Sequence, residues 1–358
     1  MTDERPSVAV VMRTRNRPLL LKRAVADVCR QTFSDWHLVV VNDGGLAADV
    51  DAVLRHHPMP TGRLTLLNNE AQRGMEAASN RGIAAQKSTY VAIHDDDDTW
   101  HPSFLARTVA HLDGTSQAAV AVRTEIVRER IQGESIVEIE REIFAPQVHA
   151  FTLFEMLRTN RTVPISVLYR RAVHDTVGWF REDLPVVGDW EFFLRLTLTD
   201  LRLGFLDGEP LAFWHQRPTA TGPAANSVVT GSTDHRDVDL LLRDEALRAY
   251  GQRHGLGGLL YTTAYFQREI DRLIVRLTEN RHREEEAVHL LRRAAELLER
   301  QAERLDQQND RLTALEAAVS DASLVSLARR RYRRWKSQAL RLVTGAQRPS
   351  THELQRQG

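Results

Sequence analysis

The sequence predicts an α/β fold, with a mixed, mainly parallel sheet between helices, followed by a C-terminal helical extension. Strand and helix signals alternate over the first hundred residues, and the strand signals are near-continuous apolar runs, typical of strands covered on both faces. Past residue 270 the apolar residues recur instead as a heptad, which is typical of a coiled coil. With 358 residues the chain can form one large or two moderate domains.

The N-terminal elements begin as a βαβ unit. Apolar runs and a helical face predict, in order, a strand at Val8 to Met12, a helix at Pro18 to Arg30, strands at Leu38 to Val41 and Leu64 to Leu67, a helix at Met75 to Gln86 and a strand at Tyr90 to Ile93. There follow β-structure from Ala118 to Ile143, a helix near Thr152 to Arg158, a strand at Ser166 to Tyr169, a helix at Trp190 to Thr199 and a strand around Leu211 to Trp214. The Pro- and Gly-rich stretch from Arg217 to Thr233 predicts a loop or lid.

Heptads predict a coiled coil over about residues 270–319. The d positions run from Ile270 to Val319, and Asn309 at an a position would fix the register of a parallel dimer. The polar break at Asn280 to Glu285 is interpreted as a turn, and a helix packed on its own domain would give a similar stripe. We therefore expect domains at 1–235 and 236–325, a basic tail at 326–358, and a homo-oligomer.

The tail combines basic and apolar side chains. Its basic residues are Arg329, Arg330, Arg331, Arg333, Arg334, Lys336 and Arg341, with Tyr332 and Trp335 among them. A basic helix with aromatic residues can lie on an anionic membrane surface. A solvated helix end or a contact with an acidic partner would give the same pattern.

Composition limits which cellular compartment and which binding partners are expected. The formal net charge is zero, so no nucleic-acid partner is expected. The single cysteine, Cys29, excludes an intramolecular disulfide, and we expect a buried thiol on a helix. The N-terminus carries acids and no apolar run reaches about 18 residues, so we expect a cytoplasmic protein without a membrane span, with peripheral contact at the inner membrane face.

Four adjacent acids, Asp95 to Asp98, follow the strand at Tyr90 to Ile93. Adjacent carboxylates repel one another, and ligands of open α/β sheets collect at the carboxyl ends of strands. The cluster therefore predicts a divalent cation, with a solvated acidic turn as the alternative.

Several motifs together carry a resemblance to a known family. They are the strand and turn Val10 to Pro18, the strand and glycine turn Val39 to Gly45, the segment Asn68 to Ala84 with the later acids, and the stretch Gly178 to Leu196. In this order and spacing, from about Ser7 to Arg217, the chain resembles the family 2 glycosyltransferases, which have the GT-A nucleotide-sugar-binding fold.

The resemblance implies roles in binding a nucleoside diphosphate sugar. Asp97 matches the last acid of the family's Asp-x-Asp motif, which ligates Mn²⁺ or Mg²⁺, and Asp95 matches the first, which contacts ribose or the metal's water shell. Asp96 falls at a variable position of the donor site. The remaining donor residues are Asp43 at the imide edge of the base, Thr14 and Arg15 at the nucleotide, and Arg73 near the diphosphate. Arg73 could equally form a surface ion pair, and His215 is either a metal ligand or a structural histidine.

The resemblance also implies a catalytic base. Asp189 matches the acid that takes the acceptor proton, although Gly188 replaces the usual preceding Glu, and Glu191 is the alternative base. Asp189 would also suit the N-cap of a helix. Trp179 and Trp190, with Glu191, are expected near the acceptor, where ring faces could pack on a sugar, although aromatic residues also serve the core.

The function expected is transfer of one sugar from a nucleoside diphosphate sugar to a hydroxyl of a carbohydrate or lipid-linked acceptor, with metal and with inversion, in cell-surface polysaccharide or glycolipid synthesis. One alternative is a non-catalytic coiled-coil assembly protein with a nucleotide-sugar-binding domain. Another is a haloacid dehalogenase-like phosphatase, which Asp95 to Thr99 would fit, but the only lysine downstream is Lys336 in the tail.

Overall fold

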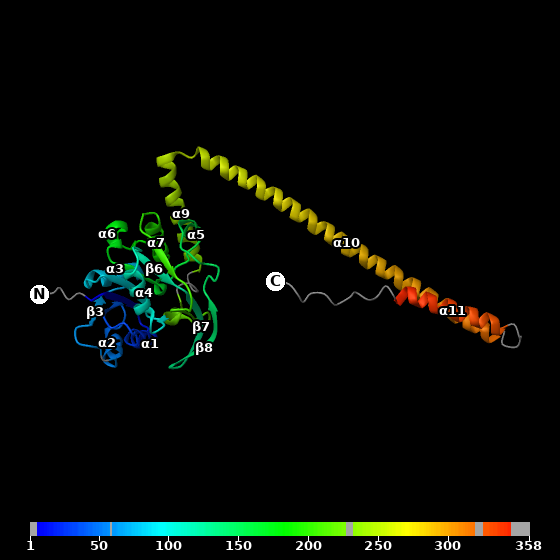
Figure 1. The fold of residues 1–358 in the computed structure, drawn as a ribbon, viewed down its shortest axis with the longest axis horizontal. Coiled ribbons are helices and arrows are strands. Elements are labelled where there is room, and N and C mark those ends of the chain that lie inside the picture. The colour runs from blue at the N-terminus through cyan, green and yellow to red at the C-terminus, as the bar shows by residue number, and fades with distance from the viewer. Residues whose placement is uncertain (1–5, 58, 227–231, 319–324, 345–358) are drawn as a thin grey trace. The chain divides into compact units, whose positions relative to one another are not determined.

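The computed structural model describes residues 6–57, 59–226, 232–318 and 325–344. Residues 1–254 and 255–358 form two compact units. The first unit contains two sheets with helices packed around them (Figure 1). The predicted α/β class is therefore confirmed, and it is the sheets of this unit that position the site.

The larger sheet is mixed and mainly parallel. Its strands lie in the order β10 (Leu203–Leu206), β6 (Ala119–Val122), β9 (Val167–Arg170), β4 (Tyr90–Asp95), β1 (Val8–Thr14), β2 (Trp36–Asp43) and β3 (Leu64–Asn69). Strand β9 is antiparallel to both β4 and β6, whereas the other paired strands of this sheet are parallel. The carboxyl ends of β1, β2 and β4 therefore meet at one edge.

The smaller sheet begins directly after the acid cluster that follows β4. Its order is β5 (Thr99–Trp100), β11 (Ala212–Gln216), β7 (Thr124–Gln132) and β8 (Ser135–Ile143). Strand β5 begins one residue after Asp98 and pairs with β11. This pairing brings β7 and β11, which are distant in sequence, to the acid cluster.

Helices cover both faces of the larger sheet. Alternate residues of β1 enter separate cores, Val10 with one helix group and Val11 with the other. The first group is α1 (Pro18–Cys29), α2 (Ala47–Arg55) and α4 (Phe104–Asp113). The second is α3 (Met75–Ala85), α5 (Leu153–Arg158), α6 (Val173–Val177), α7 (Gly188–Thr197) and α9 (Ser232–His254). Short 3₁₀ helices lie at Pro164–Ser166 and Gly222–Ala224.

Helix α9 explains where the first unit ends. Leu242 is buried in the second core, and the Arg243 guanidinium donates to the carbonyl oxygen of Leu157 at 2.7 Å. Arg181 pairs with Glu245 at 2.8 Å. These contacts tie α9 to the α/β domain, so the first unit extends past residue 235, where the sequence predicted the first domain to end.

Two local expectations are wrong. Cys29 is exposed rather than buried, because it is the last residue of α1 and Leu21, Val25 and Val28 form the core-facing stripe. The predicted turn at Asn280 to Glu285 does not form, since α10 (Gly257–Ala318) is continuous across it. The segment has no Gly or Pro to break a helix.

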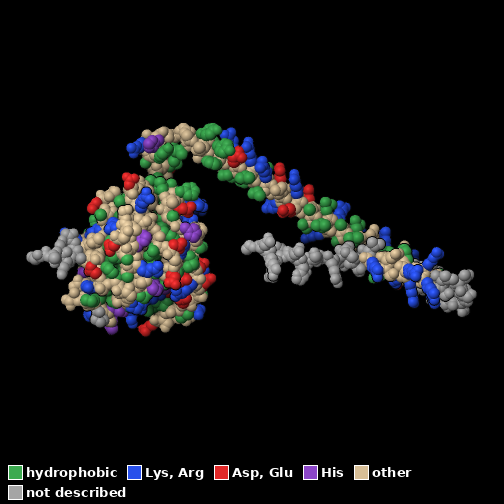
Figure 2. All heavy atoms as spheres, viewed as in Figure 1, with side chains coloured by type: hydrophobic (Ala, Val, Ile, Leu, Met, Phe, Trp, Pro, Cys, Tyr) green, Lys and Arg blue, Asp and Glu red, His purple; other side chains and the backbone are tan. Residues whose placement is uncertain are grey.

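The second unit consists of α10 and α11 (Val325–Thr344). The Tyr332 hydroxyl of α11 donates to Asn309 Oδ1 of α10 at 3.1 Å. Figure 2 shows hydrophobic side chains recurring along α10 between charged ones. The last heptad position, Val319, and residues 345–358 of the tail lie outside the described residues. Among the helices that the structure describes, none combines the length and apolarity needed to cross a membrane.

Candidate active site

The acid cluster leaves the larger sheet beside the polar turn that follows β1. Strands β1 and β4 are parallel neighbours, with Arg13 opposite Asp95 in the register. Because both strands end at the same edge, Arg13 to Arg17 and Asp95 to Asp98 meet there. The sequence predicted both segments, and the sheet order brings them together.

Arginines of the β1 turn neutralise the first two acids. The Arg13 Nε donates to Asp95 Oδ1 at 3.0 Å, and Arg17 Nη1 lies 3.2 Å from Asp96 Oδ1. Asp96 is buried, and burial raises its pKa to about 6 even though Arg17 lowers it. The cost of burying these carboxylates is thus offset by paired guanidinium groups.

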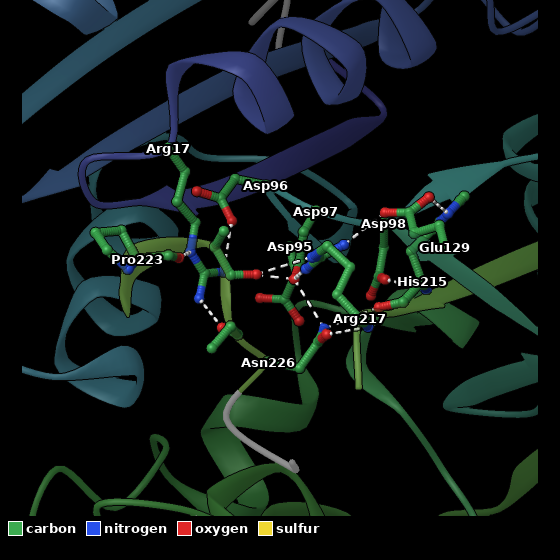
Figure 3. Close-up of polar contacts among 12 residues, drawn as sticks. Arg17, Asp95, Asp96, Asp97, Asp98, Glu129, His215, Arg217, Pro223 and Asn226 are labelled. Carbon is green, nitrogen blue, oxygen red and sulfur yellow. Dashed lines mark hydrogen bonds and ion pairs between the residues drawn. The ribbon is translucent and has the colours of Figure 1, made fainter. Parts of the chain in front are cut away.

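Asp97 is held by residues from beyond β11. Its Oδ2 accepts from Arg217 Nη2 and from Asn226 Nδ2, the latter at 3.1 Å, while Arg17 Nη1 lies 3.4 Å away (Figure 3). Its Oδ1 accepts no hydrogen bond from a described residue. Asp97 is therefore held through one oxygen, and with 6% of its surface exposed it is buried.

Glu129 of β7 is the buried acceptor behind the cluster. It accepts from Arg217 Nη1 and from Arg23 Nη1, each at 2.6 Å, and it lies 2.6 Å from His215 Nδ1. Burial alone would raise the pKa of Glu129, but hydrogen bonds from His215 and Arg23 lower it to about 2. Arg217, which is 0% exposed, thus bridges two carboxylates, those of Asp97 and Glu129.

His215 makes four contacts that fix its position. Its ring Nδ1 faces Glu129, and its Nε2 lies 2.8 Å from Thr99 Oγ1. Its backbone N–H donates to Asp98 Oδ1 at 2.8 Å, and its carbonyl accepts from Asn226. Both ring nitrogens thus have partners, so the arrangement is that of a structural histidine and metal ligation would require one bond to break.

The segment after β11 lies over the acids. Arg17 donates through Nε to the Pro223 carbonyl and through Nη2 to the Ala225 carbonyl, the latter at 2.7 Å. Arg217 Nε donates to the Ala224 carbonyl at 2.9 Å. The described part of the predicted loop or lid, up to residue 226, is thereby fastened to the acid cluster by two arginines.

A cleft of about 660 Å³ opens beside the cluster. Its lining includes most of the residues predicted to bind the donor, namely Thr14, Arg15, Asp43, Asp95 and Asp96, together with Arg13, Arg17 and Pro223. A volume of this size suits a ligand of the size of a nucleotide sugar. The predicted donor residues therefore line one cleft, although they come from three strands.

Asp43 lies at one end of this cleft. Its Oδ1 accepts from Asn69 Nδ2 at 2.6 Å and from the Arg73 N–H at 2.9 Å, and its Oδ2 accepts from the Gly74 N–H at 3.0 Å. Oδ2 keeps a lone pair for a further donor. The Arg73 side chain instead points to Glu182, at 3.9 Å, in an exposed ion pair.

Asp189 lies in a separate small cavity that shares Arg13 with the cleft. It is the second residue of α7 and accepts from Asn160 Nδ2 at 3.1 Å. Burial raises the pKa of Asp189 above its ordinary value, against the Asn160 hydrogen bond that lowers it. A buried carboxylate with a raised pKa, next to a cleft, can accept a proton from a hydroxyl.

The other predicted acceptor residues are placed differently. Trp190 is 2% exposed and its indole N–H donates to the Met156 carbonyl, so it packs in the core. Glu191 pairs with Arg195 at 2.7 Å along α7. Trp179 is 46% exposed and stacks on His174. Of the two tryptophans, Trp179 is the one that offers a ring face.

The acids do not form a closed metal cage. In the part of the chain that the structure describes, no three His, Cys, Asp or Glu side chains converge to hold an ion. Magnesium and manganese sites in phosphate-transfer enzymes commonly use one or two carboxylates plus substrate phosphates. Asp97 would offer Oδ1 to such a shared site, but it is buried and is not among the residues that line the cleft, unlike Asp95 and Asp96.

Sequence reasoning missed the counter-charges. Arg13, Arg17 and Arg217 pair with the acids, and Glu129 anchors Arg217, but none of these was assigned a role. Four adjacent carboxylates require cations, and Arg13 near the end of the neighbouring strand and Arg17 in the turn after it were a local signal of them. Nothing local distinguishes Glu129 or Arg217.

Comparisons with known proteins agree with this fold. Residues 9–176 match the model for glycosyl transferase family 2. The uncharacterized glycosyltransferase YwdF of Bacillus subtilis (strain 168) is 26% identical over 256 residues, which cover 70% of this chain and 85% of that protein. The putative colanic acid biosynthesis glycosyl transferase WcaA of Escherichia coli (strain K12) is 31% identical over 108 residues, 30% of this chain and 38% of that protein.

A solved structure has the same fold. S. aureus TarS 1–349 in complex with UDP-GlcNAc superposes with a TM-score of 0.50 at 18% sequence identity, covering 62% of this chain and 61% of that one. The N-terminal domain has the GT-A fold, its residues 9–176 match glycosyltransferase family 2, and the protein is a glycosyltransferase. The chain spans less than two thirds of WcaA and of the TarS structure, so substrates and partners are matters for proposal.

Proposed function

We propose that the protein transfers one sugar from a nucleoside diphosphate sugar to an acceptor hydroxyl, with a divalent cation and with inversion at the anomeric carbon. The observation that carries the proposal is that the cleft and the small cavity adjoin each other, with Arg13 lining both. The donor cleft contains Asp43 and Asp95, and the adjoining cavity contains the buried Asp189.

The donor residues have distinct tasks in this proposal. Asp43 Oδ2 accepts from the imide edge of the base, and Thr14 and Arg15 line the nucleotide path. Asp97 Oδ1 would hold Mn²⁺ or Mg²⁺ together with the diphosphate, and Asp95 and Asp96 lie beside them. Bound there, the cation would neutralise charge on the departing diphosphate. Because Arg73 points to Glu182, it reaches the diphosphate only after leaving that exposed pair.

Asp189 is the proposed base. It accepts the proton of the acceptor hydroxyl as that oxygen attacks the anomeric carbon, and the nucleoside diphosphate leaves from the opposite side. One displacement of this kind inverts the configuration and needs no covalent enzyme intermediate. The acceptor would enter past the exposed ring of Trp179.

The relatives and the tail support the proposed class of acceptor. WcaA is named for colanic acid biosynthesis, and a 23% identical Mycobacterium tuberculosis protein is named a PGL/p-HBAD biosynthesis glycosyltransferase. A cell-surface polysaccharide or lipid-linked acceptor suits these names and the basic helix α11.

A donor screen tests the proposal. Purified protein is incubated with a panel of nucleotide sugars that begins with UDP-GlcNAc, with Mn²⁺, with Mg²⁺ and with EDTA, and release of nucleoside diphosphate is measured. We expect one donor to be hydrolysed only with a cation. Equal release with EDTA would refute the metal requirement, and no release from any donor would refute the donor class.

A further inference from the structure

Gly188, the first residue of α7, is packed against a carboxylate from another helix. A Cβ atom added to Gly188 would lie 2.5 Å from Glu76 Oε1 and 2.6 Å from Glu76 Cδ, far closer than nonbonded atoms approach. The backbone does not require glycine here, because Gly188 is not among the glycines with positive φ. The Glu76 side chain therefore explains why position 188 carries no side chain.

The carboxylate of Glu76 is buried and accepts no hydrogen bond from any described residue. It stands in the first turn of α3, is 5% exposed, and its nearest cation is Arg13 at 3.8 Å. It lines the same small cavity as Asp189. Burial raises the pKa of Glu76 to about 7; the nearby Arg13 opposes this rise, and the charge of Asp189 adds to it. An apolar residue would fill this space at lower cost, so packing alone does not account for a carboxyl group.

Arg13 connects this acid to the donor cleft. Its guanidinium also donates to Asp95 Oδ1 at 3.0 Å and to Ser79 Oγ at 3.2 Å. Asp95, Arg13 and Glu76 thus form a row that leads from the donor cleft to the cavity of Asp189. Removing one end of the row would free the arginine between them.

We infer that Glu76 is a positioning residue of the acceptor site: from α3 it fills the space that Gly188 leaves open and holds Arg13 beside Asp189. The inference rests on the proposed role of Asp189 as base. The inference also explains why Gly188 replaces the Glu that usually precedes the catalytic Asp in the family. In this protein the Glu76 carboxylate, on α3, occupies the space beside Asp189 instead.

A stability measurement tests the packing without relying on activity. Gly188→Ala places a methyl group against Glu76 and should lower Tm by roughly 3–8 °C. In the Glu76→Ala background the same substitution should cost almost nothing, because the obstructing side chain is gone. Gly114→Ala is the control, since its Cβ would come no closer than 3.4 Å to a neighbour. Equal shifts in both backgrounds would overturn the packing.

A kinetic measurement tests the positioning role. It uses the nucleotide sugar that the wild-type protein turns over, with Glu209→Gln, an exposed acid away from the site, as control. Glu76→Gln should lower kcat roughly 10- to 100-fold, with donor Kd unchanged, because the base and Arg13 are misplaced while the nucleotide contacts remain. The double variant Glu76→Ala/Gly188→Glu returns a carboxylate from the other side and should recover about tenfold over Glu76→Ala.

Asp189→Asn, measured in the same assay, separates the two ideas. If Asp189→Asn is inactive while Glu76→Gln keeps wild-type kcat, the positioning role is refuted and the proposed function stands. If Asp189→Asn keeps wild-type kcat, the proposed function itself is refuted. Should the double variant melt early, the kcat of Glu76→Gln decides alone.

Discussion

Asp97 and Asp189 are the two carboxylates on which the proposed reaction depends, and their surroundings suit different tasks. Asp97 is tied through one oxygen to Arg217 and Asn226, which leaves the other oxygen as a hard, anionic ligand. Asp189 accepts a hydrogen bond from Asn160, and its pKa is raised by burial. The first arrangement favours a fixed charge and the second favours proton transfer.

Asp97→Asn should abolish metal-dependent donor turnover, with a fall of at least about 10²-fold, because an amide oxygen neutralises the cation poorly. Nucleotide affinity in the presence of the cation should fall as well. Turnover and calorimetric binding of the nucleoside diphosphate check this, with the exposed Asp175→Asn of α6 as control. Wild-type turnover with unchanged metal dependence would contradict the assignment.

Asp189→Asn should lower transfer by roughly 10²- to 10⁴-fold with nearly unchanged donor affinity, because an amide accepts no proton. Steady-state rates and donor Kd are measured together with those of Glu191→Gln, which should stay near the wild-type rate. A comparable loss confined to Glu191→Gln would move the base to that residue.

The pH profile of the wild-type enzyme follows from the same group. The base must be ionised, and burial raises the pKa of Asp189, so activity should be lost on acidification at a higher pH than an exposed aspartate would give. Measuring kcat/KM against pH checks the direction. An acid limb at or below the ordinary aspartate range would argue against a buried base.

Strands β7 and β11 are the elements that complete the site. They place Glu129 and His215 behind the acid cluster, and Arg217 follows β11 directly. Strand pairing in the smaller sheet therefore decides which residues stand behind the acid cluster. Helix α1 joins the same network through Arg23.

Glu129→Gln should destabilise the domain by about 3–5 kcal/mol, because Arg217 would keep a fully buried charge with one partner fewer. The pKa of Glu129 is lowered to about 2 from 4.5, so its contribution is present above about pH 4.5 and is lost as pH falls towards 2. Thermal melts at pH 7 and pH 3 check both statements. Glu138→Gln, in an exposed pair on β8, is the control, and equal losses for the two variants would contradict the prediction.

At the scale of the whole molecule, the long helix of the second unit leaves its heptad exposed. Leu291 and Leu298, both at d positions, are 70% and 66% exposed. Such a stripe on a helix of 62 residues needs a partner to be stable in water. The predicted homo-oligomer therefore remains a proposal, with a second copy of α10 as the partner.

Light scattering on the full chain should give a dimer mass. Leu291→Asp combined with Leu298→Asp should give a monomer, because charges at d positions disrupt the seam. Arg293→Ala, on the outer face of the heptad, is the control and should remain dimeric. A monomeric wild-type chain at micromolar concentration would exclude the coiled coil.

The basic helix α11 should bind anionic membranes. Figure 2 shows Lys and Arg side chains gathered on this helix, and Trp335 is 62% exposed. Each basic residue near an anionic surface contributes about 1 kcal/mol, so binding should be salt-sensitive. Co-sedimentation with anionic and with neutral vesicles at low and high salt measures it. Equal, negligible binding to both would discard the proposed peripheral location at the inner membrane face.

The sequence by itself determined the elements whose patterns are local. Periodicity predicts the apolar strands and the helices at Pro18 and Met75. The repulsion of adjacent carboxylates singles out the acids at the tip of β4 as a candidate site. Helices α2 and α4 were not anticipated, and the polar stretch at Asn280 was misjudged as a turn because charge alone does not break an exposed helix. The family resemblance predicted where along the chain the site residues lie.

Only the tertiary structure decided which residues face one another. The Arg217–Asp97 contact spans 120 positions of sequence, and Glu76 meets Gly188 from a different helix. Such pairs depend on strand order and on how helices lie across the sheet, which no local pattern encodes. The sequence therefore located the acids, whereas only the folded chain showed which arginines pair with them and that Glu76 is buried. A carboxylate needs a paired cation only when it is buried, and burial is decided when the sheets assemble.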